Sequence, residues 1–146
     1  MRAALLIESL TGHTQKAGEL IANNLQQEGW GITGISRLKH PNHAELQAAD
    51  IVIVGTWVHG LFFVGQGPFG LGTIDALPAI GGKQAAVFCT FALDPKHSLD
   101  KMTRAVESRG ATVIGGLALN RSKLQAHSEI FAERLIAALE TAPVLR

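Results

Sequence analysis

The chain has 146 residues, with 13 Lys plus Arg against 12 Asp plus Glu, a hydrophobic fraction of 47% and one cysteine. About 150 residues suffice to bury roughly 70% of the unfolded surface in one core, so we expect a single domain over residues 1–146. The net charge of +1 argues against nucleic acid as a partner, because domains that bind it usually have a strong basic excess. Every apolar run is much shorter than the ~18 residues that span a bilayer, and a lone thiol suits a reducing compartment, so we expect a cytoplasmic protein without membrane segments.

Short apolar runs alternate with longer segments of helical periodicity, a pattern typical of βαβ units. Strands are predicted at residues 3–7, 32–36, 51–54, 84–90 and 112–119. Helices are predicted at residues 14–28, 44–49 and 98–108, and a last one from Ser122, which is a good N-cap residue. The run at 51–54 has β-branched residues on both faces, as in a central parallel strand. The alternation predicts an α/β fold with an open, doubly wound parallel sheet.

A glycine-rich segment at residues 55–72 follows the third strand, and a short helix is predicted at 73–77. Loops of this length are usually functional. Residues 65–70 match the dinucleotide pattern GxGxxG, but they do not follow the first strand, and Pro68 removes one of the amides that such a loop offers. We therefore interpret this segment as a lid over a ligand.

The first predicted strand leads directly into a helix through a loop rich in hydroxyl groups: Ser9, Leu10, Thr11, Gly12, His13 and Thr14. Backbone amides and the dipole at a helix N-terminus attract an anion, and the hydroxyls add hydrogen bonds. The loop contains no lysine, so it predicts a site for a phosphate monoester and not for a triphosphate. In the alternative, Thr11 or Thr14 only caps the helix and Gly12 only makes a turn. His13 either faces the phosphate or projects into solvent.

The pattern Ser-x-Thr-Gly-x-Thr after the first strand resembles the phosphate-binding loop of the flavodoxin family. The third strand leads into Gly55-Thr56-Trp57-Val58-His59-Gly60, which looks like the second flavin-contacting loop of that family. The fourth ends in Phe88-Cys89-Thr90-Phe91-Ala92-Leu93, which is similar to the third. The resemblance covers the whole chain. It implies a flavodoxin-like five-stranded parallel sheet in the order 2-1-3-4-5, with helices on both faces, and FMN as the cofactor.

The resemblance also implies how the flavin ring is held. Trp57 matches the aromatic residue that covers one face of the ring, with Thr56, Val58 and His59 beside it. Gly60 matches the position whose peptide flips on reduction, and a glycine makes such a flip inexpensive. The opposite face of the ring and its pyrimidine edge are expected to contact Thr90, Phe91, Ala92 and Leu93. The chain has no tyrosine, the usual residue on the outer face, so Phe91, His59 or aliphatic groups are expected to take its place.

The expected function is low-potential electron transfer between a reductase and a redox partner. FMN then supplies the chemistry, and neither a catalytic residue nor a metal ligand is expected. One alternative is an FMN-dependent oxidoreductase acting on a quinone-like or porphyrin-like molecule, with Phe62 and Phe63 as apolar walls. A second is a flavodoxin-like binding module that holds no flavin.

Charge sets this chain apart from flavodoxins, which are generally strongly acidic. Residues 94–125 contain six basic and three acidic side chains. We expect Lys96, Lys101 and Arg104 to dock an acidic partner, and the alternative is an ordinary solvated helix face.

Two other candidate sites are disfavoured. Cys89 lies within a predicted buried strand, which favours a packing role over a nucleophilic one. His40 and His43 flank a turn and have no third ligand nearby in the sequence, so a metal site there is disfavoured.

Overall fold

The computed structural model describes residues 1–9, 11–58, 80–92 and 97–141. The strands are β1 (Arg2–Ile7), β2 (Gly31–Arg37), β3 (Ile51–Trp57), β4 (Gln84–Phe91) and β5 (Thr112–Asn120). The helices are α1 (His13–Gln27), α2 (His43–Ala48), α4 (Ser98–Glu107) and α5 (Leu124–Thr141). The strands form one parallel sheet in the order β2-β1-β3-β4-β5. The predicted α/β fold and its strand order are therefore confirmed.

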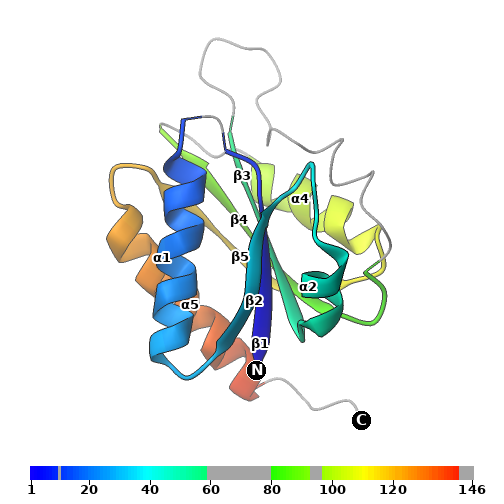
Figure 1. Ribbon diagram of the computed structural model, residues 1–146. Helices are drawn as coiled ribbons and strands as arrows, with labels where there is room; N and C mark the ends of the chain where they lie inside the picture. The colour runs from blue at the N-terminus through cyan, green and yellow to red at the C-terminus, as the bar shows by residue number, and fades with distance from the viewer. Residues whose placement is uncertain (10, 59–79, 93–96, 142–146) are drawn as a thin grey trace.

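The sheet is covered on both faces, by α1 and α5 on one side and by α2 and α4 on the other (Figure 1). One core cluster lies under α1 and α5 and includes Ile21, Phe88 and Phe131. The other lies toward α2 and α4 and includes Leu46 and Met102. The central strands β1, β3 and β4 are almost fully buried because each contributes side chains to both clusters, as continuous apolar runs require.

Two element boundaries differ from the prediction by more than one residue. Strand β3 continues through Trp57, because its ladder with β4 extends to the pair Trp57 and Thr90, so residues 55–57 are strand and not loop. Helix α5 begins at Leu124, and the Ser122 hydroxyl donates to Asn120 Oδ1, 2.7 Å away, instead of capping the helix. The predicted helix at 73–77 and the glycine pattern at 65–70 lie outside the described residues.

Gly55 makes room for a large core side chain on the neighbouring strand. It pairs with Phe88 across β3 and β4, and a Cβ atom at position 55 would meet the Phe88 ring. Phe88 is fully buried and packs edge-on against Phe131 of α5, with ring centroids 5.8 Å apart at an interplanar angle of 71°. The missing side chain of Gly55 therefore allows one of the contacts between the sheet and α5.

Cys89 lies on β4, in the cluster toward α2 and α4, and is completely buried. Burial raises the pKa of its thiol from 9.0 to about 12, because the apolar surroundings disfavour the thiolate. The reactive form of cysteine is the thiolate. The structure therefore supports the packing role that the sequence predicts.

We expect Gly55→Ala to lower the free energy of unfolding by about 1–3 kcal/mol, because the added methyl group overpacks against Phe88. The matched control is Gly115→Ala on β5, where a Cβ would meet no atom within 4 Å. This control is expected to be neutral or to stabilise by up to about 1 kcal/mol. Urea unfolding of both variants tests the pair, and equal stability would contradict the packing argument.

We expect Cys89 in the folded protein to react with a disulfide dye at neutral pH roughly a hundredfold more slowly than in urea, because the buried thiol stays protonated. The raised pKa also fixes a pH dependence. The unfolded thiol ionises near pH 9 and the folded one near 12, so this contribution to stability is complete below pH 9 and is lost as the pH rises toward 12. Rapid labelling of the native protein would contradict the assignment.

Candidate functional site

Three chain segments converge where β1, β3 and β4 end. Carboxyl ends of parallel strands meet at one edge of a sheet, and ligands of doubly wound folds bind there. The Glu8 amide, just after β1, donates to the Gly55 carbonyl of β3 at 3.0 Å. The Val58 amide, just after β3, donates to the Thr90 carbonyl of β4, also at 3.0 Å. Backbone hydrogen bonds thus connect the first segment to the second and the second to the third.

The first segment prepares the N-terminus of α1 for an anion. Gly12 is the N-cap residue and adopts a left-handed conformation with φ of 93°, and its amide donates to Ser9 Oγ at 3.1 Å. The first turn of α1 contains no acidic side chain, so nothing on the helix itself neutralises the positive end of its dipole. The first amides of a helix have no intrahelical acceptor and point outward. This geometry fits a phosphate group.

The two threonine hydroxyls do not act as helix caps, contrary to the simpler interpretation of the sequence. Thr11 Oγ1 shares a hydrogen bond of 2.8 Å with His13 Nδ1. Thr14 is buried, and its Oγ1 lies 2.7 Å from Thr90 Oγ1, on β4. The Thr14–Thr90 hydrogen bond therefore connects the first segment directly to the third. His13 is half-buried and shares its hydrogen bond with Thr11.

Aromatic side chains stand at the carboxyl ends of β3 and β4. Trp57 and Phe91 are both half-buried, whereas Thr56 is buried and Ala92 is exposed. Trp57 is paired with Thr90, whose hydroxyl contacts α1, and the pleat directs the side chains of paired residues to the same face. Phe91 packs instead against the cluster under α2 and α4. The two aromatic residues therefore belong to opposite faces of the sheet.

Four further residues that the sequence predicts to contact a cofactor lie outside the described residues: Leu10, His59, Gly60 and Leu93. Lys96, predicted to dock a partner, does as well. Within the described ranges, no three His, Cys, Asp or Glu side chains are grouped so that they could hold a metal ion. In those same ranges no helix combines the length and the apolar character needed to cross a membrane.

The sequence did not predict the ion pairs of a buried charged group at this edge. Glu8 follows β1 and is only 3% exposed. Its Oε1 lies 3.3 Å from Lys39 Nζ and 3.8 Å from Arg37 Nη2, and both cations come from the end of β2 and the turn after it. A buried carboxylate beside an anion site would repel the anion, and the two cations offset this charge. The expected strand order could have predicted these pairs. Strands β1 and β2 are parallel neighbours, so the residues that follow them lie at the same edge of the sheet.

The sequence comparisons identify a known family. The family model for a flavodoxin domain matches residues 4–117, which is most of the chain. A search of curated proteins finds none that matches.

Solved structures share the fold at low sequence identity. The Streptococcus pneumoniae TIGR4 flavodoxin is 22% identical, with a TM-score of 0.69 over 94% of this chain and 99% of that one. The two-electron reduced flavodoxin of Megasphaera elsdenii is 18% identical, with a TM-score of 0.67 over 90% of this chain and 98% of that one. Rubredoxin oxygen:oxidoreductase of Desulfovibrio gigas is 19% identical, with a TM-score of 0.65 over 97% of this chain and 37% of that longer one. The family match and the shared fold agree, and the chain belongs to the flavodoxin domain family.

Proposed function

We propose that this protein binds FMN at the carboxyl edge of the sheet and transfers electrons between a reductase and a redox partner. The observation that carries the proposal is the hydrogen bond between Thr14 and Thr90. It holds the N-terminus of α1, which has no acidic residue in its first turn and can bind an anion, against the end of β4. Half-buried aromatic side chains stand at the same edge. A phosphate site next to half-exposed aromatic side chains suits a flavin mononucleotide.

In this proposal, the loop between β1 and α1 holds the phosphate through Ser9, Thr11, Gly12, His13 and Thr14. Each threonine hydroxyl has one proton to donate and can accept two hydrogen bonds. If Thr90 donates to Thr14, the Thr14 proton is available for a phosphate oxygen. Thr90 then acts as a positioning residue, because it orients the Thr14 hydroxyl without touching the phosphate itself.

The ring of the flavin is assigned to the other two segments. We propose that Trp57, His59 and Gly60 contact it from the end of β3, and that Thr90, Phe91 and Leu93 close the other side. The bound FMN supplies the redox chemistry, and the chain contributes binding, orientation and local charge. No residue of the chain acts as an acid, base or nucleophile in this scheme.

For the partner, we propose docking through the basic residues of α4. Lys101 and Arg104 are exposed and lie three residues apart on this helix, so they share one face. A cationic face of this kind attracts an acidic protein and speeds its association. The single buried thiol is compatible with a reducing cytoplasm, which we propose as the compartment.

A second candidate function is that of an FMN-dependent oxidoreductase. It is favoured by the similarity to rubredoxin oxygen:oxidoreductase, in which the matched fold occupies 37% of a larger chain. The fold therefore also occurs as one part of an enzyme. Catalytic turnover of a quinone by the isolated protein with a chemical reductant would support this candidate over the electron carrier.

We expect the purified protein to bind FMN more tightly than riboflavin, which lacks the phosphate, and Thr90→Val to reduce this preference about fivefold. That factor corresponds to about 1 kcal/mol for one neutral hydrogen bond. Thr14→Val removes the donor itself and should have at least the same effect. Fluorescence titrations with both flavins give the four affinities.

Thr90→Ser is the matched control, because it keeps the hydroxyl and should keep the preference for FMN. If Thr90→Val weakened both flavins equally, Thr90 would not act through the phosphate. If the wild-type protein bound neither flavin, the chain would be a binding module without flavin, and the proposed function would be wrong.

We expect Lys101→Glu and Arg104→Glu each to slow electron transfer to an acidic redox protein severalfold at low salt, because each reversal removes an attraction during encounter. The difference should shrink as the salt concentration rises. The matched control is Arg134→Glu on α5, which covers the opposite face of the sheet. Stopped-flow rates at several salt concentrations measure the effect, and equal rates for all three variants would exclude docking on α4.

A further inference from the structure

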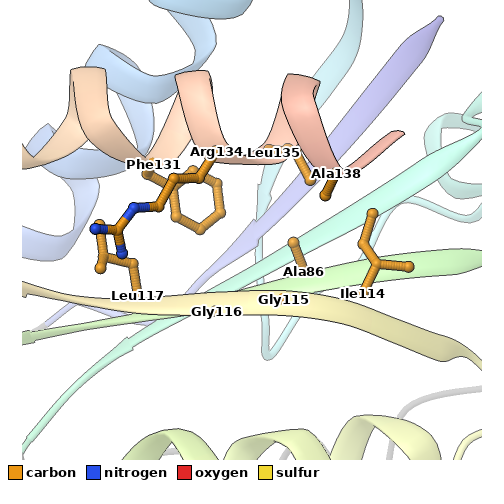
Figure 2. A pocket seen from close by; sticks show the side chains of 9 residues that line it. All are labelled: Ala86, Ile114, Gly115, Gly116, Leu117, Phe131, Arg134, Leu135 and Ala138. Carbon is orange, nitrogen blue, oxygen red and sulfur yellow. The ribbon is translucent and has the colours of Figure 1, made fainter. Parts of the chain in front are cut away.

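A cavity of about 230 Å³ lies between α5 and the edge strand β5, with Ala86 of β4 at its floor (Figure 2). Its lining is almost entirely apolar and comprises Ala86, Ile114, Gly115, Gly116, Leu117, Phe131, Arg134, Leu135 and Ala138. Ala86 and Gly115 lie in the early parts of their strands, whereas the candidate flavin site lies at the carboxyl ends. The cavity is therefore separate from that site.

The cavity exists because two small residues face α5 side by side. Ala86 and Gly115 are paired across β4 and β5, so their side-chain positions share one face of the sheet. A Cβ atom at Gly115 would meet no atom within 4 Å, whereas one at Gly116, on the opposite face, would contact Val87. The space under α5 is thus left unfilled by the sequence at this pair.

Arg134 is the charged residue of the lining, and it has no acidic partner within the described ranges. Its helix neighbours at three and four positions are Ile130, Phe131, Ala137 and Ala138, which are all apolar. Strand β5 has no charged residue. The adjacent Glu133 lines a different groove, between α1 and α5. In Figure 2 the Arg134 side chain extends from α5 toward Leu117, beside the apolar cavity.

We propose that this cavity binds a small carboxylic acid with an apolar aryl or alkyl body. The body occupies the space above Gly115, and the carboxylate pairs with the Arg134 guanidinium, whose planar donors suit a carboxylate. An apolar cavity of about 150 Å³ already admits benzene. The larger volume found here leaves room for a ring with a short chain.

The competing explanation is that the aliphatic part of Arg134 only covers apolar surface, as long cationic side chains often do. The two explanations differ in what the charge contributes. A covering role makes the cavity indifferent to charge on a ligand. A recognition role makes an acid bind better than the alcohol of the same shape.

The test is a titration of the full chain with phenylpropanoate and, in parallel, with phenylpropanol, followed by amide NMR. We expect saturable shifts at Gly115, Gly116 and Leu117 with both probes, and tighter binding of the acid. Arg134→Gln should weaken the acid about five- to tenfold and leave the alcohol unchanged. The matched control is Arg121→Gln, beyond the end of β5, which should change neither affinity.

Filling the cavity gives an independent readout. Gly115→Val is expected to abolish binding of both probes, and Ala138→Leu fills the same space from α5 if the first variant fails to fold. Equal affinities for acid and alcohol, or an Arg134→Gln variant that binds the acid normally, would overturn the proposal. So would the absence of saturable shifts, or shifts that depend on protein concentration without any probe, since the cavity would then lie in a self-association face.

Discussion

The architecture of the candidate site depends on Thr90. Its hydroxyl is bonded to Thr14 of α1, and its carbonyl accepts the amide of Val58, just after β3. One buried residue therefore holds the loop after β1 and the loop after β3 against the end of β4. A buried hydroxyl without a partner would cost about 1–3 kcal/mol, so the Thr14–Thr90 pair is mutually required. In the proposed FMN complex, these hydrogen bonds would hold the donors of the site in place before the ligand binds.

Two glycines determine how the space between the sheet and α5 is filled. Gly55 has no side chain, so the ring of Phe88 fits above it and reaches Phe131. On β5, Gly115 faces α5, and no neighbouring side chain fills the space above it, so a cavity remains. Two glycines on one face of the sheet thus have opposite consequences. One is occupied by a neighbour's ring and stabilises the fold, whereas the other leaves room for a ligand.

Charge is placed locally in this protein, although the net charge is only +1. The buried Glu8 directly precedes the loop between β1 and α1 in the sequence, and the cations Lys39 and Arg37 offset its charge. Lys101 and Arg104 are exposed on α4, where Asp100 and Glu107 lie close to them in the sequence, and Arg134 is the single Lys or Arg of α5. A near-neutral total therefore includes cations in three different settings. Each of them suggests a different role: charge compensation, partner docking and carboxylate recognition.

Apolar periodicity is a local property of the chain, so the sequence was enough to predict the alternation of strands and helices. Its resemblance to flavodoxins also supplied the strand order and the three loops of the candidate site. It did not reveal that Thr14 bonds to Thr90, that Glu8 meets Lys39 or that space remains above Gly115. Those facts depend on strand register and on contacts between residues far apart in the chain, such as the 76 positions that separate the two threonines. They become visible in the folded molecule alone, because packing, and not local pattern, brings such residues together.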